Sequence, residues 1–306
     1  RPPHPHRRVG HGRLSPILVT GVAVLDIVFA LDSFPDKPEK YRANDAYTSG
    51  GGNAANAAVA IARLGGAPTL AARLGDDDIA GMILRDLDAE GVATCLTRRF
   101  PSHRSSVSSI FTDASGERQI VNYRDTSLSM DAAWLRETSL SFDAVLADTR
   151  WPDGAVAAMQ MARDAGTPGV LDAEAPALEA PEAMRLASHV AFSAQGLRAF
   201  AEQDDLLQAL HEANRQLDGI VSVTDGAAGS WVVLDETLHH VATPPVEAVD
   251  TLGAGDVWHG ALALALAGGH DMLSAMRWAN AAGALKCTRT GGRDGYPRAT
   301  ELEEWP

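Results

Sequence analysis

An α/β fold with a mainly parallel central sheet is predicted by three features of the sequence. Short apolar runs typical of buried strands alternate along the chain with amphipathic runs typical of helices. The 306 residues are 45% hydrophobic and 22% charged, which is enough for a large core in one or two units. The longest apolar runs, such as residues 260–267, are too short to cross a bilayer, so no membrane segment is expected.

The elements follow from these patterns in chain order. Strands are predicted at residues 16–25, 144–147, 169–171, 190–192, 220–223 and 231–234. Helices are predicted at residues 53–64, 79–90, 153–165, 181–187, 204–217 and 272–286, with a further helix-forming run from 257 to 267. Residues 28–49 and 96–124 break the alternation, because they contain short strand-like pieces with turn residues, notably residues 113–116, and no helical stripe.

Charge, cysteines and the N-terminal residues narrow the function classes. A net charge of −14 argues against nonspecific nucleic-acid binding, because a polyanion would be repelled. Cys95 and Cys287 are isolated and lack metal-ligand spacing, which favours a reduced, cytoplasmic setting. Residues 1–15 are rich in Arg, His and Pro and are expected to form a flexible tail; metal or nucleic-acid binding by this tail is the less favoured alternative.

Residues 250–256, with the sequence DTLGAGD, precede a strongly helix-forming run. Gly253, Ala254 and Gly255 are therefore expected at a helix N-terminus, where free amides and the helix dipole favour an anion such as a phosphoryl group. Asp256, in the first turn, would accept the proton of an alcohol next to that group. Taken alone, a glycine-rich turn and an Asp that complements the dipole explain the same residues without chemistry.

Two signatures, about two hundred residues apart, resemble those of the ribokinase-like (PfkB-type) sugar kinases. GGGNAANAAVAIARLG, which begins at Gly50, is similar to the first signature, and DTLGAGDVWHGALALALA is similar to the second. An Ala-rich core helix alone explains neither Asn53 nor Asn56 on its first turns. The resemblance implies that Asp256 is the catalytic base, aided by the amides of Gly253, Ala254 and Gly255, and that sugar hydroxyls are bound by Asp26, Gly51, Gly52 and Asn53.

The same resemblance implies the architecture. Residues 16–306 are expected to form one kinase domain of the three-layer α/β/α type with a mainly parallel sheet. A small β-sheet lid over the sugar is expected at about residues 28–49 and 96–124, and such a lid often forms the interface of a homodimer.

ATP and cation sites are also implied by resemblance. Thr224, Gly226 and Gly229 are similar to a turn that meets the ATP phosphates and ribose, although Thr-Asp-Gly between two strands is also a common hairpin. Asn280 and Gly283 match a helix that flanks the adenine. The loop at residues 286–293, which contains Arg289, resembles one that holds a monovalent cation such as K⁺ together with carbonyls around Asp250.

Two positions depart from the family pattern. Many members carry an Asn-x-x-Glu motif that handles Mg²⁺, whereas residues 193–196 here read SAQG and contain no carboxylate. The Mg²⁺ ion is therefore expected to be held mainly by ATP and water, or by Asp172 or Glu174, and the sequence does not choose between these. Leu252 stands where a second Thr is usual, so one hydroxyl contact is lost.

Recognition of the sugar is predicted from a closer likeness to the members that phosphorylate 6-deoxy-6-sulfofructose. Residues that recognise the sulfonate there match Lys40, Asn122 and Arg150, and an ammonium, an amide and a guanidinium suit a monoanion with three acceptor oxygens. Individually, Lys40 is also explained as a solvated lysine, Asn122 as a sheet-edge residue, and Arg150 as a partner of Asp148 or Asp153.

The resulting functional prediction is an ATP- and Mg²⁺-dependent kinase that phosphorylates the C1 hydroxyl of 6-deoxy-6-sulfofructose. The partners are ATP and a small anionic sugar, with no nucleic acid and no membrane. Alternatives are a kinase for fructose 6-phosphate, fructose 1-phosphate, a keto-deoxy sugar acid or a nucleoside, and a noncatalytic sugar or nucleotide sensor on the same fold.

Overall fold

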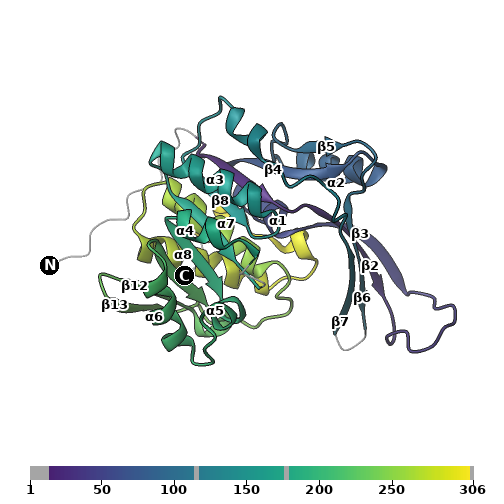
Figure 1. Ribbon diagram of the computed structural model, residues 1–306. Helices are drawn as coiled ribbons and strands as arrows, with labels where there is room; N and C mark the ends of the chain where they lie inside the picture. Colours follow the sequence, from purple (N-terminus) through teal and green to yellow (C-terminus); the bar gives the residue numbers. More distant parts are fainter. Residues whose placement is uncertain (1–13, 114–116, 176–178, 304–306) are drawn as a thin grey trace.

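The computed structural model of the chain describes residues 14–113, 117–175 and 179–303 (Figure 1). Most of the expected N-terminal tail and part of the turn expected at residues 113–116 lie outside the described residues. In the described part of the chain, none of the helices combines the length and the apolar character that crossing a membrane requires.

A nine-stranded sheet runs through the middle of the molecule (Figure 1). Its spatial order is β13-β12-β11-β10-β9-β8-β1-β4-β5, and the pairing from β11 to β5 is parallel, whereas β12 and β13 are antiparallel. The strands are β1 (Pro16–Gly21), β4 (Ala67–Gly75), β5 (Arg98–Phe100), β8 (Ala144–Asp148), β9 (Gly169–Ala173), β10 (His189–Ser193), β11 (Ile220–Thr224), β12 (Ser230–Leu234) and β13 (Thr237–Val241).

Helices cover both faces of this sheet, which confirms the predicted three-layer α/β/α architecture (Figure 1). Side chains alternate across β1, so Ile17 and Val19 pack in one hydrophobic cluster and Leu18 in the other. The first cluster includes α1 (Asn53–Arg63), α2 (Asp78–Ala89), α7 (Ala254–Ala267), α8 (Met272–Cys287) and α9 (Ala299–Glu303). The second includes α3 (Pro152–Ala165), α4 (Pro181–Leu186), α5 (Ala194–Ala201) and α6 (Leu206–Gln216).

A second, four-stranded sheet projects from one side of the main body as the expected lid (Figure 1). Its order is β3-β2-β6-β7, with β2 parallel to β6 and the two outer pairs antiparallel. The strands are β2 (Val24–Ala30), β3 (Asp45–Gly51), β6 (Ser106–Thr112) and β7 (Arg118–Tyr123).

The strand predicted at residues 16–25 is wrong as one element, because the chain leaves the main sheet inside it. β1 ends at Gly21, whose φ is 152°, and β2 starts at Val24 in the small sheet. A Cβ atom on Gly21 would lie 2.2 Å from the carboxyl carbon of Asp148, so only glycine fits beside that side chain. Asp26 therefore lies in the small sheet and not at the end of a strand of the main sheet.

Candidate active site

The loop before α7 forms the expected helix N-terminus. Gly253 is the N-cap with φ 77°, a left-handed conformation that favours glycine, and no side chain caps this helix among the described residues. The Ala254 amide donates to the Thr251 carbonyl at 3.2 Å, so this amide is already used by the turn. A Cβ atom on Gly255 would meet nothing within 4 Å. The first turn of α7 therefore faces open space at Gly255, which is exposed, and leaves room there for an anion.

Asp256 is held in place by Asn56, a residue on α1. The Asn56 amide nitrogen donates to Asp256 Oδ2 at 2.7 Å, and Asn56 Oδ1 accepts from Arg293 Nε at 2.9 Å. Arg293 therefore fixes which end of the Asn56 amide faces the carboxylate. Burial and the charge of Asp172 raise the pKa of the Asp256 carboxyl well above its ordinary value, while the hydrogen bond from Asn56 lowers it. A carboxylate with a raised pKa is a better proton acceptor, as a general base requires.

Asp26 lies on β2 beside Ser49 of β3 and Ser108 of β6. Burial raises the pKa of the Asp26 carboxyl, although a hydrogen bond with Ser108 and the charge of Arg293 act in the opposite direction.

Steric crowding explains why glycines occupy two positions of the first signature. A Cβ atom on Gly51 would lie 2.2 Å from Asp26 Oδ2, and Gly52 has φ 91° and approaches the Val22 carbonyl.

A small cavity under the small sheet brings several of these residues together. Its lining includes Asp26, Ser49, Asn56, Arg293 and Tyr296. Arg293 supplies the positive charge in this lining. Its guanidinium donates to Asn56, to Asp86 and to the Gly51 carbonyl. Its charge is thus already offset by Asp86.

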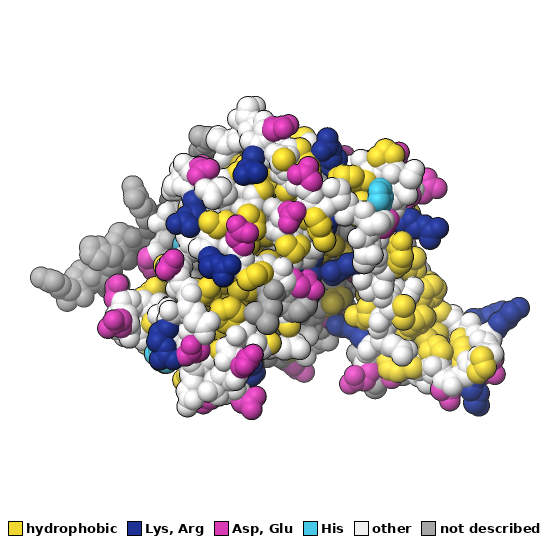
Figure 2. Space-filling model, viewed as in Figure 1, with side chains coloured by type: hydrophobic (Ala, Val, Ile, Leu, Met, Phe, Trp, Pro, Cys, Tyr) yellow, Lys and Arg dark blue, Asp and Glu magenta, His cyan; other side chains and the backbone are white. Residues whose placement is uncertain are grey.

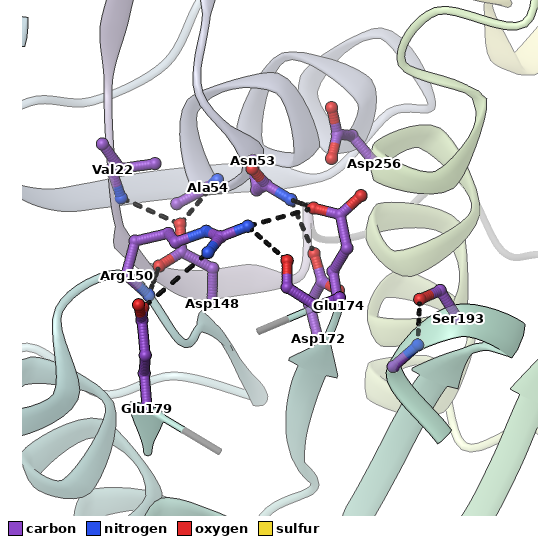
Figure 3. Close-up of polar contacts among 12 residues, drawn as sticks. Val22, Asn53, Ala54, Asp148, Arg150, Asp172, Glu174, Glu179, Ser193 and Asp256 are labelled. Atoms are coloured by element: carbon purple, nitrogen blue, oxygen red, sulfur yellow. Dashed lines mark hydrogen bonds and ion pairs between the residues drawn. The ribbon is translucent and has the colours of Figure 1, made fainter. Parts of the chain in front are cut away.

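Asn53 lies at the start of α1, where its side chain contacts one carboxylate in β9 and one directly after it (Figure 3). Its amide nitrogen donates to Glu174 Oε2 at 2.7 Å and to Asp172 Oδ2 at 3.4 Å. Asp172 is buried, and its Oδ1 atom has no hydrogen-bond partner, although His259 Nε2 lies 3.5 Å away. The structure thus places Asn53 and both candidate Mg²⁺ carboxylates in one group.

Arg150 follows β8 and points into the same group of carboxylates (Figure 3). Its Nη2 atom donates to the Ala175 carbonyl at 2.7 Å, and its guanidinium lies 3.8 Å from Glu174 and 3.7 Å from Glu179. The Arg150 side chain is 14% exposed. Its charge is therefore shared with two glutamates. The sequence had suggested Asp148 or Asp153 as the partner in their place.

Asp148 joins three segments of backbone instead of pairing with the Arg150 guanidinium (Figure 3). Its carboxylate accepts from the amides of Val22, Ala54 and Arg150 at 2.9, 3.2 and 2.8 Å. Burial raises the pKa of the Asp148 carboxyl to about 6 even though these amides lower it. The side chain thus connects the β1–β2 junction, the start of α1 and the loop after β8.

The other two residues predicted to bind a sulfonate lie on or beside the small sheet. Lys40 is exposed in the segment between β2 and β3. Asn122 lies on β7, and its amide nitrogen donates to Ser108 Oγ at 3.0 Å. No hydrogen bond or ion pair found within the described residues joins Lys40, Asn122 and Arg150.

The predicted nucleotide turn is a hairpin between the antiparallel strands β11 and β12. It is closed by a 2.9 Å hydrogen bond from the Asp225 amide to the Gly229 carbonyl. Thr224 ends β11, and Gly226 has φ 54° and open space around its α-carbon. The hairpin interpretation and the nucleotide-binding interpretation are therefore compatible.

Asn280 and Gly283 both serve the packing of α8. The Asn280 side chain accepts from Trp258 Nε1 and Ser230 Oγ at 2.7 and 3.1 Å and donates to the Val241 carbonyl at 2.8 Å. A Cβ atom on Gly283 would lie 3.4 Å from the Ala254 carbonyl, an ordinary contact distance, so α8 packs against the start of α7 at this position. Asn280 is buried, and its side chain joins α8 to the β13 backbone.

Asp250 and Arg289, predicted to hold a monovalent cation through their backbones, face Lys286. Lys286 Nζ donates to the carbonyl oxygens of both residues at 3.1 Å. Burial alone would raise the pKa of the Asp250 carboxyl, but the Leu252 amide, Arg118 and Lys286 lower it to about 2. Arg118, at the start of β7, donates to Asp250 Oδ1 at 2.6 Å and so links the small sheet to this loop.

The segment that replaces Asn-x-x-Glu begins a helix that the sequence did not predict, α5. Ser193 Oγ caps it by accepting from the Gly196 amide at 3.1 Å (Figure 3). A Cβ atom on Gly196 would lie 2.3 Å from the Ala173 carbonyl. This close approach leaves no room for a glutamate at residue 196.

Comparison with known proteins agrees with this geometry. Residues 16–299 match the model of the pfkB family carbohydrate kinases. A fructokinase of Vibrio alginolyticus and a ribokinase of Bacillus subtilis are each 30% identical, over 94% of this chain and 98% of their own lengths. The crystal structure of a putative ribokinase from Agrobacterium tumefaciens is 37% identical and superposes with a TM-score of 0.90 over 95% of this chain and 97% of its own. The chain belongs to the pfkB family of carbohydrate kinases and is an ATP-dependent phosphotransferase.

Proposed function

We propose that this kinase transfers the γ-phosphoryl group of ATP to a sugar hydroxyl, with Asp256 as the general base. The observation that carries this proposal is the place of the Asp256 carboxylate, in the first turn of the uncapped helix α7 and hydrogen-bonded to Asn56. The carboxylate accepts the hydroxyl proton while the amides of Gly255 and Asp256 stabilise the charge that develops on the phosphoryl group. The sugar lies between Asp256 and Asp26, next to Asn56.

Bound ATP supplies the phosphoryl group, and Mg²⁺ neutralises part of its charge. Thr224, Gly226 and Gly229 would meet the nucleotide at the open side of the β11–β12 turn. Within the described residues, no group of three or more His, Cys, Asp or Glu side chains is arranged to hold a metal ion. A Mg²⁺ ion would be held mainly by ATP oxygens and water, and the orphaned Asp172 Oδ1 and exposed Glu174 are the carboxylates that fit its water shell.

A neutral sugar fits the charges of the site best. Asp86 offsets the charge of Arg293 in the cavity beneath the small sheet, and Glu174 and Glu179 surround Arg150. Neither guanidinium is therefore free to bind a dianionic phosphate. The names of the relatives at 30% identity, fructokinase and ribokinase, support fructose or ribose as the acceptor.

6-Deoxy-6-sulfofructose, phosphorylated at C1, is the second candidate substrate. Its support is the residue set Lys40, Asn122 and Arg150 together with the exposure of Lys40, which leaves one ammonium available to a sulfonate. For this substrate, Arg150 would exchange a glutamate for the sulfonate, and a monoanion needs less compensating charge than a phosphate ester.

An assay of ADP formation with four sugars at equal concentrations tests the function and the substrate together. The panel contains fructose, ribose, 6-deoxy-6-sulfofructose and fructose 6-phosphate, and ADP formed without sugar is the blank. We expect sugar-dependent ADP formation, with kcat/KM highest for a neutral sugar. The highest value for the sulfonated sugar would select the second candidate, and no sugar-dependent turnover by a folded, ATP-binding protein would refute the kinase proposal.

We also propose that the small sheet forms a homodimer interface. Its edge strand β7 is exposed along its whole length, and Ile120, Val121 and Tyr123 are 53%, 61% and 42% exposed. Figure 2 shows hydrophobic side chains gathered over this projecting sheet. An exposed edge with apolar residues favours pairing with a second copy. Light scattering would give twice the chain mass, and Val121→Lys would lower it to the mass of one chain.

A further inference from the structure

Lys286, near the C-terminal end of α8, is a lysine with no exposed side-chain surface. Its ammonium donates to the carbonyl oxygens of Asp250 and Arg289, each at 3.1 Å, and lies 3.2 Å from Asp250 Oδ2. These three acceptors match the three N–H groups of an ammonium. Burying such a charge is unfavourable unless it is paired and hydrogen-bonded, and here it is both.

The ammonium joins two loops behind the first turn of α7. Asp250 begins the loop that leads to Gly253, the N-cap of α7, and Asp250 Oδ1 accepts from the Leu252 amide at 2.9 Å. Asp250 Oδ2 accepts from the Gly291 amide at 3.2 Å in the loop that follows α8. Lys286 therefore sets the path of the backbone that presents Gly253 and Asp256.

The same carbonyl oxygens are the atoms that the sequence predicts as ligands of a monovalent cation. Backbone carbonyls bind K⁺ by replacing its water shell, and a carboxylate beside them adds negative charge. An ammonium is also a compact monovalent cation, with donors that satisfy the same oxygens. Because the Lys286 ammonium already bonds to both carbonyls, a metal ion bound there would be held next to a like charge in a buried space.

We propose that Lys286 is a positioning residue whose ammonium replaces a bound monovalent cation, so that this enzyme phosphorylates its sugar without K⁺ or Na⁺. This inference rests on the proposed kinase function. Lys286 touches no reacting atom, and its effect on turnover passes through the Asp250–Gly253 loop. Removing the ammonium leaves two partly buried carbonyls and the Asp250 carboxylate without their donor, and so creates a cation site.

The test compares the wild type with Lys286→Ala and Lys286→Met in KCl, NaCl and choline chloride at one ionic strength. Wild-type kcat should agree within about twofold in all three salts, since choline is too large to replace a bound metal ion. Lys286→Ala should lose roughly 10- to 1,000-fold of kcat in choline chloride, because the amides of α7 lose their alignment, and should regain at least about tenfold in KCl. Lys286→Met fills the space with an apolar chain and should lose kcat without recovering in KCl.

Thermal unfolding in the same salts gives a readout that needs no catalysis. KCl should raise the Tm of Lys286→Ala relative to choline chloride, because an ion that binds only the folded state stabilises it, and should leave the wild type unchanged. If no sugar is phosphorylated, the proposed function fails and the Tm comparison still decides this inference. If Lys286→Ala does not fold in any salt, the wild type and Lys286→Met decide it.

Three results would overturn the inference. In the first, KCl stimulates the wild-type kcat more than about fivefold over choline chloride. In the second, Lys286→Ala is as active as the wild type in choline chloride. In the third, neither the kcat nor the Tm of Lys286→Ala changes in KCl.

Discussion

The site around Asp256 and the corner around Arg150 hold their charged groups in different ways. Asp256 receives one neutral amide donor, from Asn56, and that amide is oriented in turn by Arg293. Arg150 is surrounded by a carbonyl and two glutamates, and the side chain of each glutamate is 48% exposed. The first arrangement leaves a carboxylate ready to accept a proton, while the second leaves little free charge. The structure therefore supports a role for Asp256 in proton transfer more strongly than it supports a role for Arg150 in binding an anionic sugar.

The largest effect is expected at the Asp256 site. Asp256→Asn should lower kcat by roughly 1,000-fold or more, because the amide cannot accept the hydroxyl proton, while the Kd for the sugar changes little. Steady-state kinetics and calorimetric titration of the sugar measure the two quantities. Asp205→Asn, at the cap of α6, is the remote control and should keep wild-type kcat. Equal losses of kcat and affinity in Asp256→Asn would indicate a structural role.

Asp148 separates stability from catalysis. Asp148→Ala should lower the free energy of unfolding by roughly 2–4 kcal/mol, because the amides of Val22, Ala54 and Arg150 lose their acceptor. Urea unfolding followed by fluorescence measures this change, and Asp153→Ala, on the exposed surface of α3, is the matched control. A variant as stable as the wild type would mean that these contacts do not hold the corner together.

Asn56→Ala should lower kcat by roughly 10- to 100-fold, because the Asp256 carboxylate loses the donor that aims it. The KM for ATP should stay near the wild-type value, since Asn56 borders the proposed sugar site and not the proposed nucleotide site. Asn44→Ala, which removes an exposed amide, serves as the control in the same kinetic assay. A loss confined to the KM of ATP would contradict this assignment.

The smallest change in kcat/KM for a neutral sugar is expected from a substitution in the corner around Arg150. Arg150→Ala should change kcat/KM for fructose or ribose by less than about threefold, because the guanidinium is already engaged by Glu174 and Glu179. The same assay with 6-deoxy-6-sulfofructose is the comparison. A loss above about tenfold for the sulfonated sugar alone would establish Arg150 as its sulfonate ligand.

Patterns in consecutive residues predicted the loops, helix ends and strands whose conformation depends on the local sequence. The DTLGAGD loop, the α7 N-terminus and the alternation of strands and helices are written in consecutive residues, and the structure confirms them. The break between β1 and β2 was not predicted, because nothing in the apolar run shows that a Gly21 Cβ atom would meet Asp148 more than a hundred residues away.

Long-range pairs account for the rest of what the sequence missed. Asn56 stood out as a polar residue in an Ala-rich helix, but its partners Asp256 and Arg293 are two hundred and more residues away. Likewise, the glutamates beside Arg150 follow another strand, and the sequence suggested Asp148 or Asp153 in their place. Lys286 gave no signal as a buried cation, since a lysine in a last helical turn is usually solvated.

The dependence of kcat on pH in the wild type, Asn56→Ala and Asp256→Asn tests the central claim most directly. Wild-type kcat should fall as the pH is lowered through the raised pKa of Asp256, because the protonated carboxyl cannot accept a proton. This fall should move to higher pH in Asn56→Ala, since the Asn56 hydrogen bond lowers that pKa, and should be absent in Asp256→Asn. The same fall at the same pH in all three proteins would show that another group is the base.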